Sequence, residues 1–158
     1  MEILERIKNL LHEFTKRKLK IAIAESCTGG YVSHMITNVS GASKVFERGI
    51  VCYSNQAKIE LVGVNPEDIE IYGAVSENVV EQLSNNVRLL SKVDLGIGIS
   101  GIAGPTGGTP EKPLGLVFIG FSTDKGTIVE KLNFKSDRLT FKKLVLDYII
   151  EQVEKRYY

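Results

Sequence analysis

The residues with the clearest chemical potential form a short run from Ser26 to the paired glycines Gly29 and Gly30. The run follows an apolar segment typical of a strand and precedes a pattern typical of a helix. At such a junction, exposed main-chain N–H groups and the positive end of the helix dipole favour an anion. The glycines let a ligand approach the main chain, and Ser26 or Thr28 supplies a hydroxyl. We therefore expect a negatively charged ligand here, although either hydroxyl could instead serve only as a helix cap.

A second group occupies residues 53–58, Tyr-Ser-Asn-Gln-Ala-Lys, where a strand again gives way to a helix. Lys58 falls in the first turn of that helix, where the dipole disfavours a positive charge and burial would do the same. Its pKa should therefore fall toward the range in which a neutral amine acts as a base. Lys58 could take the proton of the Ser26 hydroxyl while Tyr53 relays or orients it, as in Ser-Lys hydrolases. The alternative is a solvated lysine beside a tyrosine packed at a sheet edge.

Other nucleophiles and metals have less support. Cys27 stands at a helix start, where thiolates are favoured, but neither His12 nor His34 falls where it would pair with Cys27. The same scarcity of histidine argues against a Ser-His-Asp triad and a metal site. Glu25 could bind a cation, but a lone acid beside a helix start more often supports the main chain. The Walker A and dinucleotide-binding glycine patterns are absent.

A glycine-rich loop is the third candidate. Residues 100–108 read Ser-Gly-Ile-Ala-Gly-Pro-Thr-Gly-Gly and follow a strand, as ligand-binding loops in α/β folds often do. The loop could hold a small molecule through main-chain groups, or it could be only a long connection. Arg138, just inside the last helix, could pair with a phosphate or carboxylate, although a single surface arginine usually serves only solubility.

Five strands and five helices are expected to position these residues. The strands are expected at 20–24, 45–53, 93–100, 114–122 and 127–134, with a hairpin turn at 124–126. Helices are expected at about 2–17, from about 32 to 38, around 57–61, at 76–92 and from 136 onward. Leu90 in the fourth of these helices and Leu144 in the last are expected to face inward. Ser54 or Asn55, Ser76 and Ser136-Asp137 are expected as caps. This alternation predicts a three-layer α/β/α sandwich with a mixed, mostly parallel sheet of about five strands.

The composition indicates one globular domain over residues 1–158. Apolar residues make up 43% of the chain and charged residues 25%, which is typical of soluble proteins. The formal charge of +1 argues against nucleic-acid or membrane binding driven by bulk charge. Acids near the amino terminus and the lack of a long apolar run argue against a secretory signal or membrane span, so we expect a cytoplasmic protein. The two cysteines, Cys27 and Cys52, lack metal-site spacing and are expected to be reduced.

Four segments, in this order and spacing, resemble the CinA carboxy-terminal domain family, the PncC-type nicotinamide mononucleotide deamidases. They are Ala-Glu-Ser-Cys-Thr-Gly-Gly at 24–30, Phe-Glu-Arg-Gly at 46–49, residues 53–58, and Ser-Gly-Ile-Ala-Gly-Pro at 100–105. Gly-Ala-Val-Ser at 73–76 and Lys-Pro-Leu-Gly at 112–115 also fit. The resemblance runs from about residue 3 to residue 156. The set of segments is highly specific for this family, although each segment alone is weak evidence.

The resemblance implies an amidohydrolase that converts nicotinamide mononucleotide to nicotinic acid mononucleotide and ammonia in pyridine-nucleotide salvage, without a metal or organic cofactor. It implies Ser26 as nucleophile and Lys58 with Tyr53 as the activating pair. Substrate-binding residues would come from the first turn, the glycine loop and the last helix: Thr28, Gly29, Gly30, Ser100, Gly101, Ala103, Gly104 and Arg138. Relatives are often dimeric, so a homodimer or higher homo-oligomer is expected. Many also carry an amino-terminal domain similar to molybdopterin-binding proteins, and this chain resembles the stand-alone form.

Two other functions stay open. The chain could be a nucleotide-binding module without catalysis, in which Ser26 and Thr28 cap a phosphate site and Lys58 pairs with the anion. The family name also suggests competence or DNA handling, against which the near-neutral charge counts.

Overall fold

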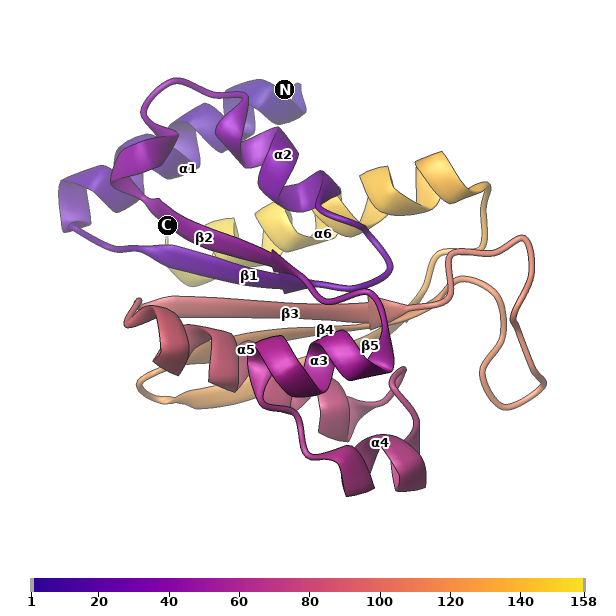
Figure 1. Cartoon of the computed structure of the whole chain (residues 1–158). Helices are drawn as coiled ribbons and strands as arrows, with labels where there is room; N and C mark the ends of the chain where they lie inside the picture. The colour runs from indigo at the N-terminus through magenta and orange to yellow at the C-terminus, as the bar shows by residue number, and fades with distance from the viewer. Residues whose placement is uncertain (1, 158) are drawn as a thin grey trace.

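A five-stranded mixed sheet lies at the centre of the computed structural model, with helices on both of its faces (Figure 1). The model describes residues 2–157, so Met1 and Tyr158 of the predicted domain lie outside the described residues. The strands are β1 (Ile21–Glu25), β2 (Phe46–Val51), β3 (Leu95–Gly101), β4 (Leu116–Thr123) and β5 (Gly126–Asn133). The helices are α1 (Ile3–Arg17), α2 (Tyr31–Thr37), the 3-10 helix η1 (Ala42–Lys44), α3 (Asn55–Val62), α4 (Pro66–Tyr72), α5 (Glu77–Ser91) and α6 (Arg138–Tyr157). The predicted α/β/α sandwich is confirmed.

The strand order decides where the site can form. The order is β2-β1-β3-β4-β5, and β1 pairs in parallel with both β2 and β3. Strand β4 is antiparallel to β3 and to β5, so β4 alone runs against the other four strands. The carboxyl ends of β1, β2, β3 and β5 therefore meet at one edge of the sheet. The segments that leave these ends are the ones that carry Ser26, Lys58, the glycine loop and Arg138.

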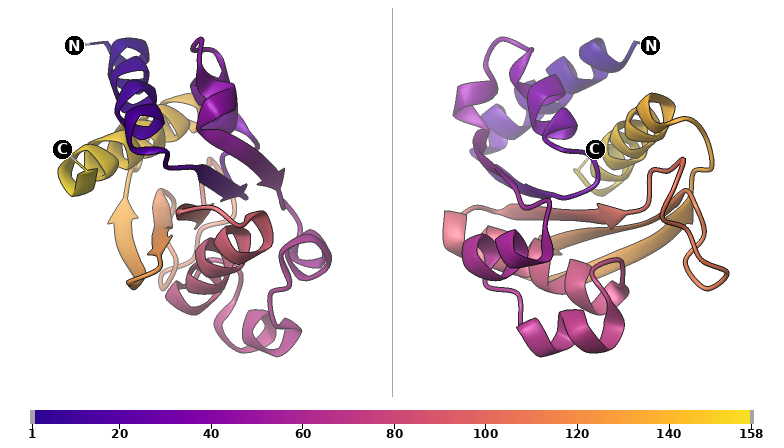
Figure 2. Two further views of the ribbon diagram at one scale, coloured as in Figure 1. Left: turned by 90° about the vertical axis from the view of Figure 1, so that its left-hand side faces the viewer. Right: turned by 45° about the vertical axis from the view of Figure 1, so that its right-hand side comes forward.

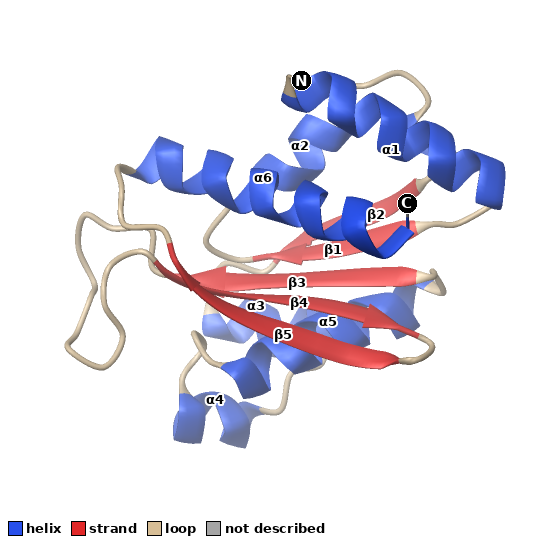
Figure 3. Cartoon of the chain, turned by 180° about the vertical axis from the view of Figure 1, so that it is seen from behind, coloured by secondary structure: helices blue, strands red, loops and turns tan. Residues whose placement is uncertain are grey.

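Each face of the sheet has its own hydrophobic core. Helices α1, α2 and α6 lie on one side of the sheet and α3, α4 and α5 on the other, as Figures 2 and 3 show. On the second side, α5 lies against the strands, and α3 and α4 pack against α5. Strand β1 is buried along its whole length because it lies between both layers. On the second face, α5 approaches β3 closely, since a Cβ on Gly98 would lie 2.7 Å from the Ser84 main-chain nitrogen. Glycine is required there by the close approach of the helix.

The predicted caps are confirmed by hydrogen bonds. The side chains of Ser54, Ser76 and Asp137 each accept from the main-chain N–H group three residues later, at 3.0, 3.3 and 2.9 Å. The expected hairpin joins β4 to β5 as predicted. Within residues 2–157, no helix is both long enough and apolar enough to cross a membrane.

Three expectations about helices were wrong. Leu90 was expected on the buried face of α5, but its exposed fraction is 51%. Helix α4 was not expected, although Asn65 caps it by accepting from Glu67 N–H at 2.9 Å and Pro66 occupies its first turn. Leu144 was expected to face inward, but its exposed fraction is 37%. The buried stripe of α6 runs through Phe141, Val145 and Ile149, and Leu144 lies at its margin.

Candidate active site

A cavity of about 290 Å³ opens at the edge of the sheet where the parallel strands end. Ligand pockets usually measure about 300–1,000 Å³, so this cavity lies at the lower limit for a small molecule. Its walls come from five segments of the chain, which contribute Ser26, Cys27, Tyr53, Asn55, Lys58, Ala74, Val75, Ser100, Gly101, Ile102, Ala103, Gly104, Thr106, Gly107 and Arg138. The sheet topology thus gathers residues that are more than 100 positions apart in sequence, from Ser26 to Arg138.

Ser26 and Lys58 are in direct contact in this cavity. The Lys58 Nζ atom lies 2.9 Å from Ser26 Oγ. Ser26 directly follows β1, and its main-chain N–H donates to the Ile99 carbonyl of β3 at 3.1 Å. Lys58 lies on α3, which begins after the end of the neighbouring strand β2. The two residues therefore follow adjacent parallel strands, and the sequence-based expectation that they lie within reach is met.

The remaining contacts of Lys58 suit a neutral amine that acts as a base. Its Nζ also donates to the carbonyl oxygens of Cys52 at 2.9 Å and Tyr53 at 3.0 Å. A neutral amine has two N–H bonds and one lone pair, and carbonyl oxygens can only accept. When both N–H bonds point at carbonyls, the lone pair faces the third neighbour, the Ser26 hydroxyl. Protonated Lys58 would instead donate to Ser26 Oγ, whose hydrogen can then turn to the Tyr53 carbonyl at 3.4 Å.

Burial shifts the protonation equilibrium of Lys58 toward the neutral amine. The residue is only 1% exposed, and no acidic group within residues 2–157 forms a salt bridge with it. Loss of hydration lowers the pKa of Lys58 because it penalises the ammonium form. The predicted fall in the pKa of this amine is confirmed in direction. A larger fraction of Lys58 is therefore neutral near physiological pH than for a solvated lysine.

The lowered pKa of Lys58 predicts a pH-dependent contribution to stability. In the unfolded chain a lysine keeps its proton up to about pH 10.4, whereas folded Lys58 loses it at lower pH. Between the two pKa values the unfolded chain binds more protons, so the free energy of unfolding contributed by this group rises with pH, by at most about 1.4 kcal/mol per pH unit. The free energy of unfolding can be measured in urea for wild type and Lys58→Met from neutral pH to about pH 10. As the pH rises, the free energy of unfolding of wild type should increase relative to that of Lys58→Met. A difference that does not change with pH would contradict this.

Tyr53 contributes its main chain to the contact with Lys58. Its side chain is 62% exposed, and its hydroxyl forms no hydrogen bond within the described part of the chain. The preceding residue, Cys52, is wholly buried, and side chains alternate along extended backbone, so Tyr53 points outward to the rim of the cavity. The expected relay through the Tyr53 phenol is therefore not formed here, and the carbonyl oxygen orients the amine instead.

The start of α2 already holds a negative group that belongs to the protein. The Glu25 carboxylate accepts from the N–H groups of Val32 at 3.0 Å and Ser33 at 2.8 Å. The Thr28 hydroxyl is buried and donates to the same carboxylate at 2.6 Å. Glu25 therefore already accepts from the two N–H groups at the helix start where a ligand anion was expected. The prediction that Glu25 supports the main chain at the start of the helix is confirmed.

Three residues expected to bind substrate do not line the cavity. Thr28, Gly29 and Gly30 are absent from its walls, because the turn that they form folds away toward α2 and α6. A Cβ on Gly29 would lie 3.7 Å from Lys142 Nζ, a cation that the sequence analysis did not single out. Lys142 follows Arg138, which does line the cavity, by one turn of α6.

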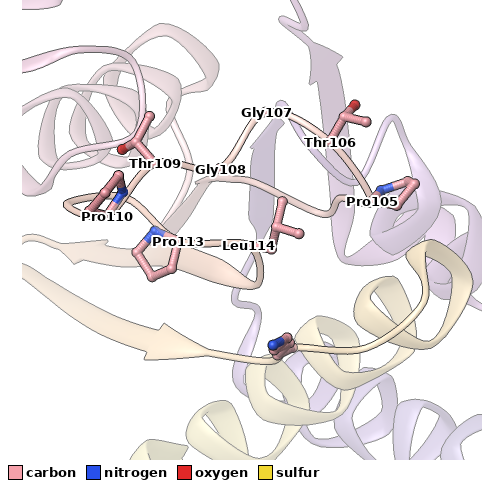
Figure 4. Close-up of a pocket in the computed structure, with 9 residues that line it drawn as sticks. Pro105, Thr106, Gly107, Gly108, Thr109, Pro110, Pro113 and Leu114 are labelled. Carbon is pink, nitrogen blue, oxygen red and sulfur yellow. The ribbon is translucent and has the colours of Figure 1, made fainter.

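The expected residues of the glycine loop, Ser100, Gly101, Ala103 and Gly104, all line the cavity. The base of the loop is fixed by main-chain bonds between Ile102 and residues 115–116. Beyond it the chain folds back on itself around a second cavity of about 530 Å³, shown in Figure 4, which shares Thr106 and Gly107 with the first. Lys112 Nζ ties this outer part to α4 by donating to the Tyr72 carbonyl at 2.6 Å.

Cys27 is a poor nucleophile in this setting. Its thiol is nearly buried, and loss of hydration, with the nearby Glu25 charge, raises its pKa to about 12. Burial also raises the pKa of Cys52. His34 contacts Asn38 at 3.2 Å, and His12 lies on α1, so neither histidine supplies a base to these thiols.

Some lining residues were missed by the sequence analysis. Asn55 was considered only as a cap, and Ala74 and Val75 only as part of a family segment. The main-chain carbonyl oxygens of Cys52 and Tyr53, which accept from Lys58, could not be identified from the sequence, because every residue has a carbonyl oxygen. Within residues 2–157, no three His, Cys, Asp or Glu side chains lie close enough together to hold a metal ion.

Comparison with known proteins links this site to one family. The family model of the CinA C-terminal domain matches residues 4–157. A protein of Thermoanaerobacter pseudethanolicus named for competence-damage induction is 52% identical over 123 residues, which are 78% of this chain and 30% of that protein. A CinA-like protein of Kosmotoga olearia is 48% identical over 134 residues, 85% of this chain and 32% of that protein. The chain thus spans about a third of the length of these curated relatives.

The fold is also shared with solved structures. The competence/damage inducible protein CihA of Agrobacterium tumefaciens superposes with a TM-score of 0.93 and 31% identity, covering 97% of this chain and 94% of that one. A competence or damage-inducible protein of Enterobacter asburiae gives a TM-score of 0.94 and 28% identity, covering 100% and 99%.

Proposed function

This chain belongs to the CinA C-terminal domain family, and we propose that it is an amidohydrolase that converts nicotinamide mononucleotide to nicotinic acid mononucleotide and ammonia. The observation that carries the proposal is the 2.9 Å contact between Ser26 Oγ and the buried amine of Lys58 inside a cavity of small-molecule size. A hydroxyl beside an uncharged amine is an activated nucleophile. The choice of nicotinamide mononucleotide as substrate rests on the family resemblance.

In the first half of the reaction, Ser26 Oγ attacks the carboxamide carbon and Lys58 Nζ accepts the hydroxyl proton. The negative charge that develops on the carboxamide oxygen needs N–H donors. The N–H groups of Ala103 and Gly104 suit this role, because both residues line the cavity and neither N–H donates elsewhere within the described residues. Protonated Lys58 then gives its proton to the leaving nitrogen, the C–N bond breaks, and ammonia departs from an acyl-enzyme.

In the second half, water attacks the ester carbon of the acyl-enzyme. Lys58, neutral again, takes a proton from this water, and the bond to Ser26 Oγ breaks as the serine recovers its hydrogen. The net reaction is amide plus water to carboxylic acid plus ammonia. The Cys52 and Tyr53 carbonyls hold the amine in place throughout, since both accept from Nζ in either protonation state.

Release of ammonia separates this proposal from its main alternative. Purified protein incubated with nicotinamide mononucleotide, with no metal added, should release ammonia and nicotinic acid mononucleotide together. Binding without ammonia release, and with an affinity unchanged by Ser26→Ala, would instead favour a nucleotide-binding module. The relatives' names refer to competence and damage, and tight, strongly salt-dependent DNA binding would favour a DNA-handling role.

Arg138 is proposed to bind the phosphate of the substrate. It lines the cavity from the first turn of α6, and an arginine hydrogen-bonds a phosphate more strongly than a neutral donor does. Arg138→Gln should lower kcat/KM for nicotinamide mononucleotide by about tenfold, mainly through KM, and should hardly change turnover of the riboside that lacks the phosphate. Lys143→Gln is the matched control, because Lys143 is exposed on the same helix and does not line the cavity. Equal losses with both substrates would contradict the assignment.

We also propose that the protein works in the cytoplasm as a homodimer or higher homo-oligomer, and that it needs neither a metal nor an organic cofactor. Size measurement in solution and full activity after treatment with chelator are the corresponding tests.

A further inference from the structure

We propose that Glu25 is a positioning residue for the Ser26–Lys58 pair: its carboxylate fixes the turn that carries Ser26, and its main chain fixes the segment that holds Lys58. The inference rests on the proposed Ser-Lys chemistry. It assigns to a buried acid a part in setting the distance between nucleophile and base. Glu25 itself does not line the cavity, so it acts only through these neighbours.

The carboxylate of Glu25 is enclosed by donors from the segment that follows it. The residue is wholly buried and forms no salt bridge within residues 2–157. One oxygen, Oε1, accepts from Thr28 Oγ1 at 2.6 Å and from Val32 N at 3.0 Å. The other, Oε2, accepts from Ser33 Oγ at 2.6 Å and from Ser33 N at 2.8 Å. These four bonds close residues 26–33 into one unit around the side chain that precedes the nucleophile.

The start of α2 depends on this side chain. The residue at the usual capping position is Gly30, which has no side chain to accept a hydrogen bond. Buried main-chain N–H groups need acceptors, and the positive end of the helix favours a negative one. The Glu25 carboxylate, at the end of β1, supplies the acceptor oxygens and the negative charge. The direction in which the chain leaves β1 at Ser26 is therefore tied to the position of α2.

The main chain of Glu25 reaches the other partner. Its carbonyl oxygen accepts from Cys52 N–H at 2.8 Å and lies 3.5 Å from the Cys52 thiol. The carbonyl of Cys52 accepts in turn from Lys58 Nζ at 2.9 Å. One residue thus connects the turn that carries the nucleophile with the carbonyl that aims the base. A displacement of about 1 Å between reacting groups can lower a rate by about 100-fold, so this connection matters for catalysis.

Replacement of Glu25 by glutamine tests the positioning role, because main-chain N–H groups donate to both carboxylate oxygens. A glutamine has nearly the same shape but offers one carbonyl oxygen and one NH₂ group. Each carboxylate oxygen of Glu25 receives a main-chain N–H as well as a hydroxyl. The hydroxyls could rotate to accept from an NH₂ group, but a main-chain N–H cannot. Either orientation of glutamine therefore sets an NH₂ group against a buried N–H, and the turn must move.

The experiment compares Glu25→Gln with Glu154→Gln. Glu154 pairs with Arg6 between α1 and α6, at 2.6 Å, and does not line the cavity, so its substitution costs stability away from the site. Glu25→Gln should lower kcat for nicotinamide mononucleotide by about 10- to 100-fold with KM changed by less than about threefold. Glu154→Gln should leave both constants unchanged. A folded Glu25→Gln enzyme with wild-type kcat, or one in which only KM rises, would overturn the proposal.

A second readout does not depend on the substrate. The rate at which a fluorophosphonate labels Ser26, verified by its loss in Ser26→Ala, should fall at least about tenfold in Glu25→Gln and stay unchanged in Glu154→Gln. If wild type labels but releases no ammonia, the amidase proposal fails, while this comparison still decides the role of Glu25. If Glu25→Gln does not fold, Ser33→Ala serves instead, since it removes one hydroxyl from the carboxylate and leaves the N–H. A folded Ser33→Ala with unchanged labelling rate and kcat would then overturn the inference.

Discussion

Ser26→Ala is expected to reduce the rate of ammonia release from nicotinamide mononucleotide by at least about 1,000-fold. The substitution removes the oxygen that would form the acyl-enzyme. No other hydroxyl or carboxylate within residues 2–157 lies within hydrogen-bonding distance of Lys58 Nζ, so no other side-chain oxygen is placed for Lys58 to activate. The measurement is kcat by coupled ammonia detection, with isothermal titration to show that the variant still binds the nucleotide.

Cys27→Ala is the matched control for that prediction. Cys27 is the next residue and also lines the cavity, but its thiol is protonated at neutral pH because burial raises its pKa to about 12. Most of the activity should therefore remain. Loss of activity in Cys27→Ala with an intact fold, together with residual activity in Ser26→Ala, would transfer the nucleophile to the thiol.

Most of the fold could be predicted because its elements carry strong local signals. The stripe of Ile7, Leu10, Leu11 and Phe14 in α1 has the period of a helix. The apolar run of β1 has no such period, but its short length and the glycines that follow it favour a strand. Helix α4 escaped notice because it is short and buries only Ile69. Its signals were a capping asparagine followed by proline, which are also typical of a turn. Short helices of this kind are set by their caps more than by an apolar face.

The candidate site was predictable to the extent that it depends on strand ends. Ser26, Lys58 and Arg138 follow strands that point the same way, and Ser100 lies near the carboxyl end of a fourth. Their convergence could therefore be expected from the order of elements. The roles of Thr28 and Tyr53 could not, because they depend on which way a side chain leaves a turn. Thr28 points inward to Glu25, and Tyr53 points outward from the edge of the sheet. Neither orientation is determined by residue type or spacing.

The same limit applies to the expected anion site. A helix start with two glycines before it is a general signal for a negative group. The sequence cannot say whether that group is a ligand or a carboxylate of the protein, and here Glu25 is the nearest one in the chain. The glycine pattern did correctly locate a tight turn of the main chain at the end of a strand. This turn places Ser26 in the wall of the cavity.

Lys58→Met is expected to lower kcat by about 100- to 10,000-fold, the usual contribution of a general base. Methionine fills similar space but has no lone pair that can accept the Ser26 proton. In wild type, kcat/KM should rise with pH and level off above the pKa of Lys58, because only the neutral amine is a base. That midpoint should lie below the ordinary pKa of a lysine, since burial lowers it. The rate that remains in Lys58→Met should lack this rise.

Lys58→Arg distinguishes a base from a structural donor. An arginine can still donate to the carbonyls of Cys52 and Tyr53, but it stays protonated at every accessible pH. If the amine only holds these carbonyls and Ser26 in place, Lys58→Arg should keep a substantial part of the activity. If the amine must accept a proton, Lys58→Arg should bind the nucleotide and be as inactive as Lys58→Met. An active Lys58→Arg, or a pH profile unchanged in Lys58→Met, would remove the base from the mechanism and leave Ser26 without activation.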